Sequence, residues 1–159
     1  MLEVRQTQND DKQLAVDIFE FYSRISGNSA LIQKSFEEIE QVVLGGLSFV
    51  AFIGEKVVGF VTFRNWPDYV EPMTLIVDLD YRRIGIGGKL LSKMFATFRR
   101  DFKEKTITAF PNELSISLIL ENGLVQQDRD QIPQFLKEVY SDELADPKFD
   151  HVLFATSVS

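Results

Sequence analysis

Residues 74–100 constrain the fold most, because they join a buried strand to an amphipathic helix through a glycine-rich turn. The segment opens with the apolar run Leu75-Ile76-Val77, which is typical of a short buried strand. From Gly85 onwards, apolar side chains recur at helical spacing, with basic side chains on the other faces. The apolar positions are Leu90, Leu91, Met94, Phe95 and Phe98. A strand that runs into a helix in this way indicates a mixed α/β fold.

The turn between strand and helix reads Arg82-Arg83-Ile84-Gly85-Ile86-Gly87-Gly88. Glycine is costly at a helix start, since it loses more backbone entropy on folding than any other residue. It does allow a ligand to approach the first N–H groups of the helix, which have no partner within the helix and lie at its positive end. With two arginines alongside, the turn predicts a site for a phosphate-bearing ligand. The alternative is a flexible turn that packs the helix tightly against a sheet.

Two common phosphate-binding loops do not fit this turn. A Walker loop requires Gly-Lys-Ser/Thr, whereas Gly88-Lys89 is followed by Leu90. A dinucleotide fingerprint requires a third glycine where Leu90 stands, and it belongs near the start of a domain rather than in mid-chain.

The turn instead resembles the acetyl-coenzyme A loop of the GNAT N-acetyltransferases, Val-x-Pro-x-x-Arg/Gln-x-x-Gly-x-Gly/Ala. Residues 77–87 carry this pattern, with Leu79 in place of the proline. A second segment, residues 112–124, is similar to the next motif of the family, Asn-x-x-Ala-x-x-x-Tyr-x-x-x-Gly-Phe. Two motifs in the family's order, about thirty residues apart, make the resemblance much more specific than either motif alone.

Periodicity along the chain predicts the order β-α-α-β-β-β-α-β-α-β-(α)-β. Apart from the helix in parentheses, which is an addition, this resembles the order of the GNAT family. The fold class expected is therefore α/β (α+β), with a mixed, mostly antiparallel seven-stranded sheet flanked by helices. A helix capped by Asn9 and a second one from Ile32 to Val43 follow the first strand. The fourth strand is expected at residues 74–79, a short helix capped by Asn112 before Gly123, and an additional helix at residues 133–144. The remaining strands are expected at residues 2–6, 48–53, 57–63, 106–110, 124–127 and 152–156.

Length and composition narrow the functional classes. At 159 residues, we expect residues 1–159 to form one domain. The net charge of −7 argues against nucleic acid as a partner. It either favours a cationic substrate or simply keeps the protein in solution. There is no cysteine, no apolar run of membrane-spanning length and no signal-like N-terminus, so we expect no metal, no membrane association and a cytoplasmic location.

The resemblance implies a coenzyme site in which backbone amides from Arg83 to Lys89 hold the pyrophosphate of acetyl-coenzyme A, with charge from Arg82 and Arg83. It also implies that the edge of the fourth strand pairs with the pantetheine arm, helped by the Asn112 side chain. A bulge that frees an N–H for the thioester carbonyl would fall at Ile76, Val77 and Asp78. The full set of implied coenzyme-binding residues is Ile76, Val77, Asp78, Arg82, Arg83, Ile84, Gly85, Ile86, Gly87, Gly88, Lys89 and Asn112.

The catalytic groups are less defined. In the family, a carboxylate on or before the fourth strand deprotonates the acceptor amine; Glu71 is the candidate base and Asp78 the alternative. A solvated loop residue is the other interpretation of Glu71, which precedes Pro72. Relatives commonly protonate the thiolate with a tyrosine, but Ile119 stands there, and the general acid is unknown. The tyrosines of this chain, at positions 22, 69, 81 and 140, lie outside that helix.

Two functional hypotheses follow. The first is an acetyl-coenzyme A-dependent N-acetyltransferase that modifies a primary amine of a small molecule or protein by direct attack in a ternary complex. The second, motivated by Ile119, is a catalytically weak acyl-coenzyme A-binding or protein-interaction module on the same fold. Trp66 and Tyr69 could line an acceptor pocket or serve as packing aromatics, and His151 is more simply a structural or exposed residue. The sequence leaves the acceptor and the oligomeric state open, a homodimer included.

Overall fold

The computed structural model describes residues 1–27, 33–111, 115–147 and 154–157. Seven strands form one sheet in the order β1-β2-β3-β4-β5-β7-β6. They are β1 Leu2–Gln6, β2 Ser48–Ile53, β3 Lys56–Asn65, β4 Tyr69–Val77, β5 Thr106–Ala109, β6 Leu124–Gln127 and β7 Phe154–Ser157. Of the strand pairs described, only β4 and β5 run parallel. This mixed, mostly antiparallel sheet with flanking helices confirms the predicted fold class.

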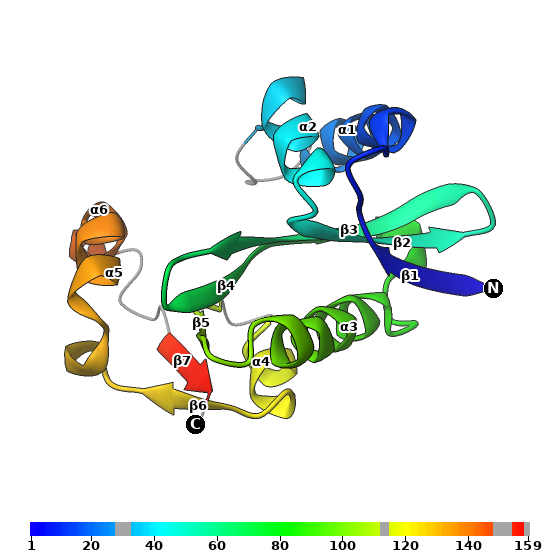
Figure 1. Cartoon of the computed structure of the whole chain (residues 1–159). Coiled ribbons are helices and arrows are strands. Elements are labelled where there is room, and N and C mark those ends of the chain that lie inside the picture. The colour runs from blue at the N-terminus through cyan, green and yellow to red at the C-terminus, as the bar shows by residue number, and fades with distance from the viewer. Residues whose placement is uncertain (28–32, 112–114, 148–153, 158–159) are drawn as a thin grey trace.

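The helices cover both faces of the sheet (Figure 1). Helices α1 Lys12–Ser26 and α2 Phe36–Leu44 lie on one face, and α3 Ile86–Asp101 and α4 Ile116–Glu121 on the other. Helices α5 Gln134–Val139 and α6 Ser141–Ala145 stand at the end of the sheet near the beginning of β4 and β5. Short 3₁₀ turns occupy Leu79–Tyr81 and Arg129–Gln131.

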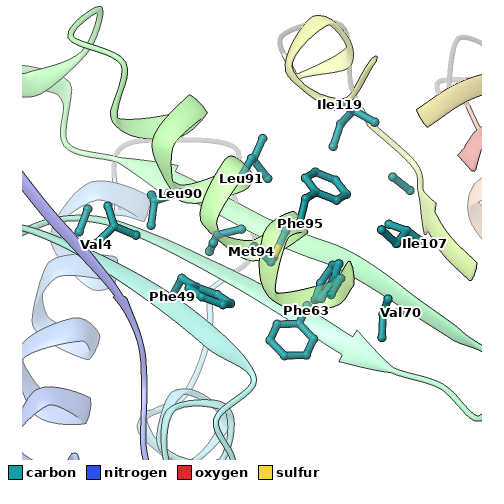
Figure 2. Packing of buried hydrophobic residues seen from close by; sticks show 14 of the residues in the cluster. Val4, Phe49, Phe63, Val70, Leu90, Leu91, Met94, Phe95, Ile107 and Ile119 are labelled. Atoms are coloured by element: carbon teal, nitrogen blue, oxygen red, sulfur yellow. The ribbon is translucent and has the colours of Figure 1, made fainter. Parts of the chain in front are cut away.

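The largest apolar cluster lies between α3 and the sheet, as Figure 2 shows. It contains the side chains that the helical spacing singled out, Leu90, Leu91, Met94, Phe95 and Phe98. Gly59 on β3 makes the close approach of α3 possible, because a Cβ there would lie 2.8 Å from Ile86 Cγ2 and 2.9 Å from Leu90 Cδ1. A second cluster joins α1 and α2 to the opposite face through Val50, Phe60 and Ile76.

Several predicted boundaries are wrong, each for a local reason. Helix α1 begins after Asp11 rather than Asn9, because the Asp11 carboxylate is bound by Arg5 and the Gln8 amide. Helix α2 begins at Phe36, since the Ser35 hydroxyl accepts from the Glu38 amide and caps it there; Ile32 lies outside the described residues. Ser115 directly precedes α4, and Asn112, the predicted cap, lies outside the described residues.

The predicted helix at residues 133–144 is two short helices that meet at Tyr140. Tyr140 has φ −105° and ψ 24°, outside helical geometry, although the Leu144 amide still donates to its carbonyl at 2.8 Å. At this break the Tyr140 side chain reaches β4, where its hydroxyl bonds Glu71. A buried cluster around Ile132 and Leu136 packs these helices against aromatic side chains of the neighbouring elements.

Strand β4 begins at Tyr69, five residues before the predicted start. Glu71 and Pro72 are therefore strand residues, paired with Arg64 and Phe63 of β3. Proline is tolerated because β4 pairs with β5 only through Tyr69 and Val70, so the edge beyond Val70 has no ladder that needs its missing N–H. Among the described residues, no helix is long and apolar enough to cross a bilayer.

Candidate active site

The parallel strands β4 and β5 separate after a single short contact. Tyr69 pairs with Thr106 and Val70 with Ile107, and no register partner is found beyond them in the described strands. The edge of β4 from Glu71 to Val77 is therefore open toward β5. This opening leads to the N-terminus of α3, because β4 runs directly into the loop that precedes the helix. An extended, amide-bearing ligand can pair with such an edge as a strand would.

The loop from β4 to α3 is held in an unusual backbone conformation. Gly85 caps α3 with φ 85°, and Arg83 has φ 68°, a left-handed conformation that non-glycine residues seldom adopt. No side chain caps α3 within the described residues. The first helical bond to the Gly85 carbonyl comes from the Lys89 amide at 3.0 Å. The amides of Ile86, Gly87 and Gly88 thus precede the helical ladder and point out of the helix start.

The folded chain itself does not require glycine at positions 87 and 88. A Cβ on Gly87 would make ordinary contacts of 3.7–3.9 Å with Leu75, Val77 and Leu118, and one on Gly88 would lie 3.6 Å from Leu118. Neither residue has a positive φ. Since each glycine in a helix costs about 1 kcal/mol relative to alanine, packing among the described residues does not account for the pair.

A β-bulge in β4 lies closer to Glu71 than predicted. Val61 pairs with Leu75 and Phe63 with Pro72, so Thr62 faces two residues of β4, Met73 and Thr74. The Thr74 amide donates to the Thr62 hydroxyl at 3.2 Å. The expected position at Ile76, Val77 and Asp78 is therefore wrong, because at Ile76 and Val77 the ladder with β3 is regular.

Glu71 is buried, with 1% of its surface exposed, and both its carboxylate oxygens accept hydrogen bonds. Trp66 Nε1 donates to Oε1 at 3.0 Å, and the Tyr140 hydroxyl donates to Oε2 at 2.5 Å. Burial raises the pKa of Glu71 above its usual value, although both hydrogen bonds and the charge of Arg64 act in the opposite direction. The interpretation of Glu71 as a solvated loop residue is therefore wrong.

Asp78 is also buried, but it is surrounded by cations. Arg24 Nη2 lies 2.9 Å and Lys56 Nζ 3.7 Å from its Oδ2, while Oδ1 accepts from the Asp80 amide at 3.0 Å. Burial alone would raise the pKa of Asp78, but the Arg24 and Asp80 bonds and the two positive charges outweigh it, so the pKa lies below its usual value. Its own amide donates to the Val58 carbonyl at 2.9 Å. Asp78 thus fixes the start of the glycine-rich loop.

Ile119 is a core residue, 3% exposed, in the same buried cluster as Leu91 and Phe95 (Figure 2). No proton donor occupies that position of α4. The hydroxyl beside Glu71 comes instead from Tyr140, 69 residues further along the chain. From the sequence, Tyr140 was only one of four tyrosines, placed within the additional helix predicted at residues 133–144. Asn112 and His151 lie outside the described residues.

Comparison with known proteins gives the class of this chain. The family model described as "Acetyltransferase (GNAT) family" matches residues 14–123, which is more than half of the sequence. The chain therefore belongs to the GNAT acetyltransferase family. No curated protein sequence matches it significantly.

Solved structures of the same fold extend over almost the whole chain. Rv2747 from Mycobacterium tuberculosis, in complex with CoA and NLQ, is 17% identical with a TM-score of 0.71, covering 99% of both chains. The PaiA N-acetyltransferase from Thermoplasma acidophilum, in complex with coenzyme A, is 14% identical with a TM-score of 0.64, covering 100% of this chain and 99% of its own.

N-acetylglutamate synthase from Neisseria gonorrhoeae, complexed with coenzyme A and N-acetyl-glutamate, is 15% identical with a TM-score of 0.70. The match covers 99% of this chain but only 35% of the synthase, so the chain spans about a third of that protein's length. At these identities the similarity establishes the fold.

Proposed function

We propose that residues 1–159 form one domain that transfers the acetyl group of acetyl-coenzyme A to a primary amine of a small molecule or protein. The amine attacks the thioester directly while both substrates are bound. The observation that carries this proposal is the uncapped, glycine-rich start of α3 at the end of the open edge of β4. Family membership and the coenzyme A bound in the structural neighbours support it.

The pyrophosphate would lie against the amides of Ile86, Gly87 and Gly88, where the helix dipole favours negative charge. Arg82 and Arg83 are exposed beside them and would add positive charge, and the exposed Ile84 and Gly85 complete the loop. The Lys89 amide belongs to the helical ladder, so we assign Lys89 only a side-chain role. Asn112 stays a candidate from the motif alone.

The pantetheine arm would pair with the open edge of β4 at Ile76 and Val77. The Asp78 amide is already bonded to Val58, so we assign Asp78 to shaping the loop. The reacting thioester would then reach the bulge at Met73 and Thr74, where the β4 ladder is interrupted.

Glu71 is the better candidate for the general base. Its raised pKa makes it a stronger base than an ordinary carboxylate, and it lies two residues before the bulge. The Asp78 carboxylate is bound by Arg24 and Lys56, and its lowered pKa makes it a weak base. We therefore propose Glu71 as the base and withdraw the catalytic assignment of Asp78.

A charge placed at position 87 tests the coenzyme site. In Gly87→Asp the new Cβ meets only ordinary contacts, and a carboxylate at a helix N-terminus is favourable by about 0.3–1 kcal/mol. We expect thermal stability to be kept and coenzyme A affinity to fall at least tenfold by calorimetry, because the carboxylate repels the diphosphate. The matched control Gly87→Ala adds the same Cβ without charge and should bind within a few-fold of wild type. Equal affinity of wild type and Gly87→Asp would refute the site.

Thiol release with a panel of primary amines, including lysine peptides, tests transfer itself. Turnover with any member supports the enzyme. Coenzyme A binding without transfer to any acceptor would favour the alternative, an acyl-coenzyme A-binding module. A cytoplasmic location is proposed because acetyl-coenzyme A is an intracellular metabolite. Nucleic acid is not proposed as a partner, since the net charge is −7.

A further inference from the structure

Glu71 cannot touch an acceptor amine directly in this structure. Its surface is 1% exposed, and each carboxylate oxygen already accepts a hydrogen bond, from Trp66 at 3.0 Å and from Tyr140 at 2.5 Å. Because Glu71 is closed off from solvent, the most direct route for a proton runs through one of the two groups already bonded to it.

The two partners of Glu71 differ in what they can transmit. An indole N–H is a donor with no acceptor lone pair, so Trp66 can hold the carboxylate but cannot pass on a proton. A phenol oxygen donates and accepts at once. Tyr140 can therefore give its proton to Glu71 while its oxygen receives another.

Tyr140 also faces the part of β4 where the reaction is proposed to occur. Its hydroxyl oxygen lies 3.6 Å from Met73 Sδ, and Met73 is one of the two bulge residues. Both Tyr140 and Met73 are partly exposed, in contrast to Glu71. Of the two bonded residues, Tyr140 is therefore the one with surface open to solvent, whereas Glu71 is enclosed.

We propose that Tyr140 relays the proton of the acceptor amine to Glu71, an inference that rests on the proposed function. The ammonium group of the acceptor gives one proton to Tyr140 Oη as the phenol proton passes to Glu71 Oε2. The products of this step are a neutral amine, a neutral Glu71 and an intact phenol. The amine then attacks the thioester, and after the cycle the proton leaves Glu71 for solvent by the same route.

The charges around the pair suit this direction of transfer. Arg64, opposite Glu71 on β3, favours the ionised carboxylate at rest, and Glu143 on α6 helps to keep the phenol protonated. Burial and the Glu71 carboxylate raise the pKa of Tyr140 far above its usual value, so the phenol does not act as a base by itself. Instead, the phenol passes a proton from the amine to Glu71.

The experiment compares steady-state acetyl transfer and its pH profile in wild type, Glu71→Gln, Tyr140→Phe and the double variant. In wild type, kcat/KM should rise with pH as Glu71 ionises. In Tyr140→Phe, we expect kcat to fall about 10²–10⁴-fold with the KM for acetyl-coenzyme A unchanged. The rise of kcat/KM with pH (the acidic limb of the profile) should vanish in all three variants. The kcat of the double variant should be no lower than that of either single variant.

Trp66→Phe is the matched control, because it removes the other hydrogen bond of Glu71 and leaves the phenol in place. It should keep the acidic limb, moved to higher pH by the loss of a bond that lowers the pKa of Glu71. Fluorotyrosine introduced at position 140 keeps the shape of the ring and changes the acidity of the phenol. The relay predicts that this substitution alters kcat, whereas a purely structural role predicts no change.

The outcomes separate the two proposals. A wild-type protein that acetylates no amine overturns the proposed function. An active wild type whose Tyr140→Phe variant is folded and turns over within a few-fold of it overturns the relay alone. A Tyr140→Phe variant that is slowed further by Glu71→Gln and keeps its acidic limb would reduce Tyr140 to a positioning residue and also overturn the relay.

Discussion

Two buried carboxylates on one strand and its following loop have opposite electrostatic environments. Glu71 has two neutral donors and, among the residues that the structure describes, no ion-pair partner, so burial dominates and its pKa is raised. Asp78 has Arg24 and Lys56 beside it, and its pKa is lowered. These environments suit Glu71 to act as a base and Asp78 to act as a structural anion. The sequence pattern could not distinguish the two roles, because both residues are simply acidic and lie near the same strand.

Asp78→Asn should loosen the glycine-rich loop. The pKa of Asp78 is lowered in the folded state, so its stabilisation is present above the unfolded value of 3.8 and lost as pH falls through the lower folded value. At pH 7 we expect the free energy of unfolding to fall by about 1–2 kcal/mol, a range kept small because Arg24 and Lys56 are half exposed.

Urea unfolding at several pH values measures this effect. The difference between wild type and Asp78→Asn should shrink as pH falls below 3.8. Asp80→Asn, at an exposed neighbour, is the control and should change stability by no more than about 0.5 kcal/mol. A difference that stays constant with pH would show that the charge of Asp78 is not what holds the loop.

At the scale of elements, the helices α5 and α6 decide whether the candidate site is complete. They stand at the end of the sheet (Figure 1). The Tyr140 ring packs against Phe110, with ring centroids 4.6 Å apart and planes tilted by 40°, and its hydroxyl reaches Glu71. Leu136 of α5 is fully buried in the small cluster that holds them there. The insertion formed by α5 and α6, between β6 and β7, is therefore part of the catalytic proposal, although it lies after the region that the family model matches.

Leu136→Ala should release α5 and α6 from the sheet without unfolding the rest of the domain. Loss of a fully buried leucine side chain costs about 2–5 kcal/mol, and here the loss falls on a small satellite cluster. We expect faster amide hydrogen exchange confined to α5 and α6, a lower kcat and unchanged coenzyme A affinity. Val139→Ala on the same helix, at a residue that is 42% exposed, is the control and should leave all three measurements close to wild type. Uniformly faster exchange across the sheet would contradict a local role.

Local patterns predicted most elements well. The strands at residues 48–53 and 124–127 have the predicted bounds, and the short helix α4 ends before Gly123 as expected. The errors that matter most for the site fall on β4, because Pro72 and Glu71 look like loop residues until the divergence of β5 removes the need for a second ladder. The bulge was misplaced for the same reason, since register belongs to a pair of strands and not to one sequence.

For the molecule as a whole, the charge of −7 should affect encounter with the acceptor. If the net field steers a cationic amine, kcat/KM for that amine should fall severalfold as the salt concentration rises from about 10 mM to about 500 mM, because the Debye length drops from roughly 30 Å to a few ångströms. An amine that is uncharged at the assay pH should show little change. If kcat/KM depended equally on salt for both amines, the negative net charge would serve to keep the protein in solution and not to steer the substrate.

The sequence by itself determined the order of elements, the amphipathic faces and the glycine-rich turn, because these depend on residues that are neighbours along the chain. Tertiary structure alone decided that Glu71 is enclosed, that the bulge falls at Met73 and Thr74, and that Tyr140 meets a carboxylate 69 residues away. Such contacts depend on the separation of β4 from β5 and on the break between α5 and α6. Those features arise from packing between distant segments, and such packing does not produce a periodic pattern of residues in the sequence.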